Sequence, residues 1–183
     1  NSDETSAPLT QAGWIDDPKL LAALPTRAES ENGTCVAAYG MSFTFRVSDA
    51  AKQLDPNLTV RGRGGPAAPL NHSYALFRDD LGRHDARYAV IGVLASSFPA
   101  FNSMSHLTWN FEFPGVFTYP RYEFQNGELR AVDTGVDSLK DFRNVRRFSA
   151  TRSGFSQTLA QHDAFYSPFL YEQNVLDSSS VLR

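Results

Sequence analysis

Residues 34–44 read TCVAAYGMSFT, and this stretch decides the fold. Residues 34–39 form a short apolar run that ends at Gly40, which is typical of a buried parallel strand. Residues 43–54 follow at once, with apolar side chains near helical spacing. This stretch therefore predicts a strand that leads directly into a helix.

The same alternation continues along the chain. We expect a second strand at 58–60, a Gly-rich loop at 61–66, a helix at 69–81 and the strongest strand at 88–94. The order strand–helix–strand–helix–strand indicates an α/β domain with a parallel sheet and right-handed crossovers. We place this domain at 34–183, after an N-terminal segment at 1–33 that carries a short helix at 17–24.

Residues 106–133 interrupt the alternation with an aromatic-rich insert. Asn126-Gly127 separates residues 122–124, YEF, from residues 129–132, LRAV, and this dipeptide predicts an antiparallel hairpin. Aromatic side chains of the insert, Trp109 among them, either wall a substrate pocket or form a small core for the hairpin. Later stretches at 138–148, 156–166 and 176–183 look helical.

Composition limits the classes of function. The chain of 183 residues has 17 Lys and Arg against 20 Asp and Glu, which does not suggest a nucleic-acid binder. No apolar run approaches the ~20 residues of a membrane span. A lone cysteine, Cys35, cannot build a Cys-rich zinc site, and we expect neither a metal nor a cofactor. The chain begins at Asn1, so either it was trimmed or a leader was removed, which would place the protein outside the cytoplasm.

Ser42 stands where chemistry is expected in such a fold. It follows the first strand, and open α/β sheets bind ligands at the carboxyl ends of their strands. A helix N-terminus there suits a developing oxyanion. On spacing alone, the simpler interpretation is that Ser42 only caps the helix.

Three stretches resemble the conserved blocks of SGNH (GDSL-like) hydrolases. Residues 39–44, YGMSFT, resemble the first block, G-[DN]-S-[FL]-[ST]. The loop at 64–68, GGPAA, is similar to the second block, G-x-P-G. Residues 91–97, IGVLASS, lie where the third block, G-x-N-D, should follow the third strand. The resemblance covers roughly residues 34–102.

The resemblance implies a serine esterase or O-acyl transferase on a flavodoxin-like three-layer α/β/α sandwich. Ser42 would be the nucleophile, acting on a small-molecule or carbohydrate ester such as an acetylated sugar. The N–H groups of Ser42 and Ala67 would form the oxyanion hole, with Gly64 as the first glycine of the second block. An asparagine is the family's third donor, and the aligned stretch offers Ser96 or Ser97, with Asn102 nearby.

The sequence departs from the family at two further points. Met41 replaces the Asp or Asn before the serine, where it would line the site as an apolar filler. The D-x-x-H block is absent, because none of the residues three before His72, His84, His106 and His162 is acidic. His72 and His106 could line the site, although a surface or helix-capping role is simpler for His72 and a solvated loop position is simpler for His106. His162-Asp163 looks like a surface pair.

A flavodoxin-like sheet usually has five strands in the order 2-1-3-4-5, and we find three parallel ones. We therefore expect an incomplete sheet within this chain. A further segment or a second chain would pair with the strand at 88–94 and supply the catalytic histidine. The alternative is a non-catalytic SGNH-like module that binds a glycan or a protein partner.

Overall fold

The computed structural model describes residues 23–25, 33–65, 67–105, 118–132, 134 and 154–166. Several predictions lie outside these residues. They are the helices at 138–148 and 176–183, nearly all of the helix at 17–24, and the roles of His106 and Trp109. The described elements are, in order, β1 (Thr34–Gly40), α2 (Ser42–Leu54), β2 (Leu58–Gly64), α3 (Leu70–Asp80), β3 (Tyr88–Ile91), the 3₁₀ helix η2 (Ala95–Asn102), β4 (Arg121–Gln125), β5 (Glu128–Val132) and α6 (Gly154–His162).

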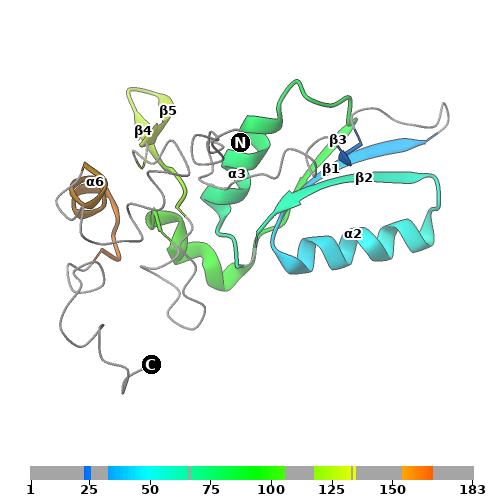
Figure 1. The fold of residues 1–183 in the computed structure, drawn as a ribbon, viewed down its shortest axis with the longest axis horizontal. Coiled ribbons are helices and arrows are strands. Elements are labelled where there is room, and N and C mark those ends of the chain that lie inside the picture. Colours follow the sequence, from blue (N-terminus) through cyan, green and yellow to red (C-terminus); the bar gives the residue numbers. More distant parts are fainter. Residues whose placement is uncertain are drawn as a thin grey trace, which may run out of the picture.

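The predicted α/β alternation is confirmed. The three strands form a parallel sheet in the order β2-β1-β3, with β1 in the centre. Figure 1 shows α2 along one face of this sheet and α3 on the other. Successive side chains of a strand point to opposite faces, so Ala37 and Tyr39 pack against Leu76 of α3. Their neighbours Val36 and Ala38 line the α2 side.

Two predicted boundaries are wrong. The stretch 61–64, predicted as a loop, continues β2, because β2 pairs with β1 as far as Gly40 and Gly64. Its alternate side chains, Arg61 and Arg63, are buried against acidic partners of α3. At the other boundary, β3 ends at Ile91 and not at residue 94, since η2 begins at Ala95 and draws the chain away from the sheet.

Strand β3 lies at an edge of the sheet as described. It pairs with β1, and no other described strand pairs with it. Its side chains are largely exposed, including Tyr88 and Val90, whereas the sequence favours a strand covered on both faces. Native proteins rarely leave such an apolar edge bare. A further strand beside β3 therefore stays a prediction.

The hairpin in the insert is confirmed. Strands β4 and β5 pair antiparallel, and the turn residues Asn126 and Gly127 have φ values of 52° and 84°, as a type I′ turn requires. The hairpin joins α3 and not the parallel sheet. The Tyr74 and Tyr122 rings meet edge to face at 4.9 Å between centroids.

Helix α6 ends at His162, four residues before the predicted end. The residue that follows, Asp163, is buried, and its carboxylate accepts hydrogen bonds from the N–H of Met104 at 2.8 Å and the hydroxyl of Ser103 at 3.2 Å. The prediction of a surface pair at 162–163 is therefore wrong for Asp163. Among the described helices, none has the length and apolar character to cross a membrane.

Candidate functional site

A glycine ends β1 and β2 and directly follows β3, so three glycines lie at the carboxyl ends of the parallel strands. A Cβ at Gly40 or Gly92 would lie 2.1 or 1.9 Å from Thr44 Oγ1, and a Cβ at Gly64 would lie 1.7 Å from the carbonyl oxygen of Gly40. Side chains at these positions would collide with α2 or with β1. The glycines therefore let the first turn of α2, with the buried Thr44, lie directly against the strand ends.

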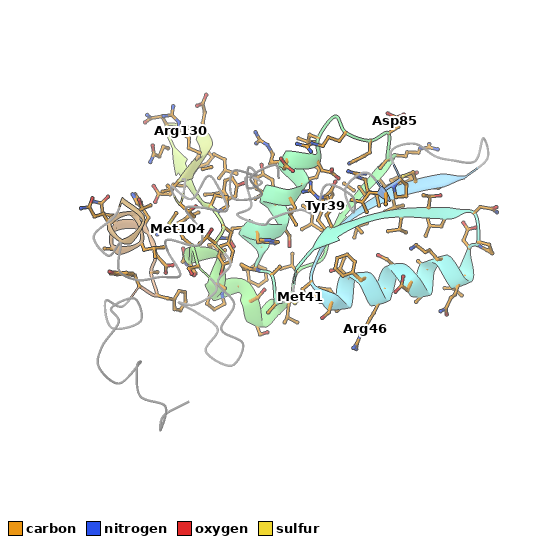
Figure 2. The ribbon with its side chains drawn as sticks, viewed as in Figure 1. Tyr39, Met41, Arg46, Asp85, Met104 and Arg130 are labelled. Carbon is orange, nitrogen blue, oxygen red and sulfur yellow. The ribbon has the colours of Figure 1, made fainter. Side chains whose placement is uncertain are left out.

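Ser42 is the first residue of α2 and is exposed to solvent. The N-cap is Met41, which has extended backbone angles and makes no side-chain capping bond. The interpretation of Ser42 as the cap is therefore wrong. Figure 2 shows Met41 where the strands give way to α2. The first N–H groups of a helix have no intrahelical partner, so this uncapped N-terminus can donate hydrogen bonds to an anion.

The loop after β2 is tied to the same edge. The N–H of Gly65 donates to the Gly40 carbonyl at 3.2 Å, and the N–H of Ala68 donates to the Gly65 carbonyl at 3.3 Å. Between them, Ala67 has a φ of 48°, a left-handed conformation that favours glycine. Ala67 thus adopts a backbone conformation that glycine adopts more readily than alanine does.

Three other residues expected around Ser42 have contacts or burial of their own. Ser97 is buried, and its hydroxyl donates to the Leu94 carbonyl at 2.7 Å. Asn102 is half-buried, and its carbonyl accepts from the N–H of Ala164 at 3.0 Å. Met41 is buried as an apolar residue. Ser97 is therefore engaged within η2, and Met41 fills space beneath the turn.

Each of the three described histidines has other contacts. His72 is buried against the Tyr119 ring, with centroids 6.0 Å apart, so its predicted surface role is wrong. His84 Nε2 lies 3.0 Å from the Tyr39 hydroxyl. His162 Nδ1 lies 3.2 Å from a Glu123 carboxylate oxygen, and this contact lowers the pKa of Glu123. None of these contacts involves Ser42.

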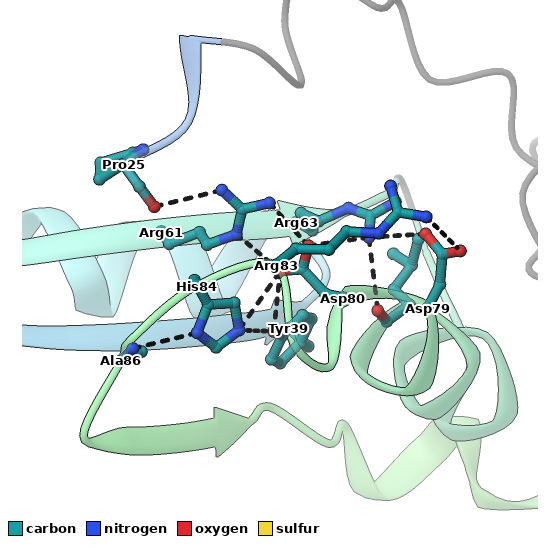
Figure 3. Close-up of polar contacts among 10 residues, drawn as sticks. Pro25, Tyr39, Arg61, Arg63, Asp79, Asp80, Arg83, His84 and Ala86 are labelled. Atoms are coloured by element: carbon teal, nitrogen blue, oxygen red, sulfur yellow. Dashed lines mark hydrogen bonds and ion pairs between the residues drawn. The ribbon is translucent and has the colours of Figure 1, made fainter. Parts of the chain in front are cut away.

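A buried polar network that the sequence analysis missed lies between β2 and α3 (Figure 3). Asp80 receives two hydrogen bonds from Arg61, at 2.6 and 2.7 Å, and one from the Tyr39 hydroxyl at 3.0 Å. Arg63 lies 2.9 Å from Asp79 and 3.3 Å from Asp80. The available signal was the pair of arginines at alternate strand positions, which places both on one face.

The charges of this network compensate one another. Burial alone would raise the pKa of Asp80, but the hydrogen bonds and charge of Arg61, with Tyr39 and Arg63, hold it below its usual value. Burial, together with the nearby Asp80 carboxylate, raises the pKa of the Tyr39 phenol. His84 Nδ1 accepts the N–H of Ala86 at 3.1 Å, which leaves the ring proton on Nε2 to face Tyr39. The network stabilises the α3 face.

Two hollows open on the described surface. A groove of about 290 Å³ lies between α2 and the sheet, with Val47 and Val90 among its lining residues. A larger cleft of about 420 Å³ lies between α3, η2 and the hairpin. Ser42 lines neither hollow.

Comparisons of the chain with family models, with curated proteins and with solved structures find no match. Within the described residues, no group of three or more His, Cys, Asp or Glu side chains is placed to hold a metal ion. Functional interpretation therefore depends on the local geometry at the strand ends and on the chemistry of Ser42.

Proposed function

We propose that this chain is an SGNH-like serine esterase or O-acyl transferase domain with Ser42 as its nucleophile. The observation that supports it is the exposed Ser42 on the first residue of an uncapped helix, at the carboxyl edge of a parallel β2-β1-β3 sheet. This order is the start of the flavodoxin-like 2-1-3-4-5 arrangement. The substrate would be an ester, for example an acetylated carbohydrate.

The chemistry follows from this placement. Ser42 Oγ attacks the ester carbonyl carbon while a base takes the hydroxyl proton, and a tetrahedral oxyanion forms. The leaving alkoxide departs with that proton, and the acyl group passes from Ser42 to water or to an acceptor hydroxyl. The N–H groups of Ser42 and Ala67 would hold the oxyanion. The φ of 48° at Ala67 supports this role, because the resembled block has a glycine at the matching position. Loss of one such donor costs about 10²–10³ in kcat in other enzymes.

The catalytic base must come from outside the described residues. His72, His84 and His162 have the contacts given above, and a serine hydroxyl is a poor nucleophile without a base. We include in the proposal a further segment or a second chain that brings a histidine to Ser42; the fourth histidine of this chain, His106, lies outside the described residues. The same element would add a strand at the edge of β3, where no described strand pairs.

The test uses labelling and turnover of matched serine variants. Ser42→Ala should abolish both fluorophosphonate labelling and hydrolysis of p-nitrophenyl acetate. Ser48→Ala is the control, because Ser48 lies on the same helix and its hydroxyl donates to the Thr44 carbonyl at 2.8 Å. Equal activity in the Ser42 variant and the native protein would refute the nucleophile assignment.

A second candidate is a non-catalytic SGNH-like module that binds a glycan or a protein partner. It is favoured by Ser97, whose hydroxyl is bonded to Leu94 and not available as an oxyanion donor. The labelling experiment separates the two. Protein assayed together with the segment or chain that supplies the histidine, if it takes no fluorophosphonate at Ser42 yet is retained on a glycan array, would support the binding module and contradict the esterase.

A further inference from the structure

The cleft beside α3 is walled by aromatic and aliphatic side chains from three elements. Its lining residues include Leu70 and Tyr74 of α3, Phe98 and Phe101 of η2, and Tyr122 and Leu129 of the hairpin. Phe98, Phe101 and Leu129 are 48%, 42% and 49% exposed. The volume of about 420 Å³ falls in the usual range of small-molecule sites. The charges around the cleft decide which class of small molecule it suits.

The hairpin turns its charged side chains away from the cleft. Residues directly opposite each other in an antiparallel pair share a face, and the faces alternate along each strand. Leu129 pairs with Phe124, so Leu129 and Tyr122 stand on one face, which is the cleft face. The other face carries the charged residues Arg121, Glu123, Glu128 and Arg130. The sequence of η2 has no charged residue, so neither element brings a carboxylate to the cleft.

A cation, Arg78, adjoins the cleft near the end of α3. Leu70, Tyr74 and Arg78 follow one another at four-residue intervals, which places them on one side of the helix. Arg78 Nη1 donates a hydrogen bond to the Tyr74 hydroxyl at 3.4 Å. Burial raises the pKa of Tyr122 to about 12, although the nearby charge of Arg78 favours the phenolate. That phenol therefore stays neutral at ordinary pH and does not compensate the charge of Arg78.

Arg78 has no acidic partner among the described residues, where its polar contact is Tyr74. Arg63 and Arg83 differ in this respect, because both pair with Asp79, at 2.9 and 3.3 Å. Arg78 is also exposed, so a molecule from solvent can reach its guanidinium. An uncompensated cation beside an apolar hollow suits a ligand that combines an apolar body with a negative charge.

We propose that the cleft between α3, η2 and the hairpin binds an organic carboxylate with an aromatic body. The body lies against Phe98, Phe101 and Leu129, where it can pair with aromatic rings. The carboxylate lies at the rim and accepts hydrogen bonds from Arg78, whose planar guanidinium matches a carboxylate in a two-bond fork. Because the rim is open to water, the anion keeps part of its hydration. Ser42 does not line the cleft, so this site is independent of the proposed esterase chemistry.

The test compares two ligands that share one aromatic body. Biphenyl-4-carboxylate carries the negative charge, and biphenyl-4-carboxamide is its neutral counterpart of nearly the same shape. In isothermal titration calorimetry, native protein should bind one carboxylate per chain, about three- to tenfold more tightly than the carboxamide. The preference should shrink in about 1 M salt, which screens an exposed ion pair.

Variants of Arg78 test the source of the preference. Arg78→Gln should lower the affinity for the carboxylate to that for the carboxamide and leave the carboxamide affinity unchanged. Arg78→Glu should reverse the preference, and it should bind the cation biphenyl-4-ylmethylammonium about three- to tenfold more tightly than native protein does. Arg46→Gln is the matched control, because Arg46 is also exposed but lies on α2, on the opposite face of the sheet (Figure 2).

Substitutions in the wall test where the aromatic body lies. Phe101→Ala and Leu129→Ala remove apolar contact from two different elements, and both native side chains are partly exposed, which favours folded variants. Each should weaken binding of both ligands about three- to tenfold. The ratio of the two affinities should stay as in native protein, since Arg78 sets the ratio and the wall does not.

Each outcome is decisive for variants that keep the native circular dichroism spectrum. A preference for the carboxylate that is lost in Arg78→Gln and kept in Arg46→Gln supports the site. Native protein that binds neither ligand, or binds both equally, overturns the proposal. A preference that survives Arg78→Gln, or native affinity in both wall variants, also overturns it.

Discussion

Asp80→Asn should be among the most destabilising single changes in this chain. The Asp80 carboxylate is fully buried, and it accepts both hydrogen bonds of the Arg61 fork as well as the Tyr39 hydroxyl. An asparagine of the same shape has one acceptor oxygen and turns an NH₂ group toward donors. It also leaves the Arg61 and Arg63 charges with one carboxylate fewer inside the protein.

The expected loss in the free energy of unfolding is about 3–5 kcal/mol, the usual effect of breaking a buried ion pair by removing one partner. Two hydrogen bonds to a charged group, at about 1.5–3 kcal/mol each, give a similar figure. A typical domain has only about 5–15 kcal/mol of stability in total. The variant should therefore unfold at a much lower urea concentration.

The measurement is urea unfolding followed by circular dichroism, with Asp49→Asn as the matched control. Asp49 pairs with Lys52 at 3.8 Å on the exposed face of α2, where an ion pair contributes about 0–1 kcal/mol. A joint replacement of Arg61 by Met and Asp80 by Leu should recover much of the loss, because it leaves no unpaired charge. Equal unfolding midpoints for Asp80→Asn and Asp49→Asn would refute the reasoning.

The same network also predicts how the free energy of unfolding depends on pH. Because the folded pKa of Asp80 is depressed, its contribution to stability is present above the ordinary pKa of about 3.9 and is lost as the pH falls through the folded value. Native protein should therefore lose stability below about pH 4 more steeply than Asp80→Asn. Parallel curves for the two proteins would contradict the assigned role.

Two further predictions concern packing. Gly92→Ala should lower the free energy of unfolding by about 1–3 kcal/mol, because its Cβ would meet Thr44 Oγ1 at 1.9 Å. When it is combined with Thr44→Ala, the two losses should not add. Additive losses in urea unfolding would contradict the contact. Tyr39→Phe should cost about 1.5–3 kcal/mol, since it removes the hydroxyl between Asp80 and His84; an unchanged urea midpoint would show that the hydroxyl contributes nothing.

The order of the elements could be predicted because its signals are local. The apolar run at 34–39 and the periodicity of 43–54 need no distant partner to be recognised. The same holds for the hairpin, whose turn needs positive φ at Asn126 and Gly127, a conformation that these residue types tolerate. Neither prediction required knowledge of where the elements pack.

The misassigned residues depend on partners far along the chain. Arg61 and Arg63 look like loop residues because their acidic partners lie on the next helix, 19 residues beyond Arg61 for Asp80. Asp163 looks exposed because the N–H that it accepts, at Met104, lies 59 residues away. Hydrophobic patterns cannot predict a polar residue that is buried by pairing.

In the candidate site, too, some positions could be predicted from local sequence and others depend on distant partners. The position of Ser42 at the start of α2 follows from local sequence, whereas the inward turn of Ser97 depends on how η2 leaves the sheet. The burial of Asn71 carried no local signal either, because its Nδ2 donates to the carbonyls of Ser103 and Pro120, which lie 32 and 49 residues away.

The residues that stabilise the fold and the serine proposed as nucleophile lie on different parts of the sheet. A loss of activity can therefore be separated from a loss of stability. The buried ion pairs stand on the α3 face, and the close glycine contacts seat the first turn of α2 through Thr44. Ser42 belongs to neither set, since it is exposed and the N-cap is Met41. Its replacement by Ala removes little packing, and Ala is a good helix former. A loss of turnover in Ser42→Ala at unchanged stability would therefore report on catalysis, whereas the same loss in Gly92→Ala would not.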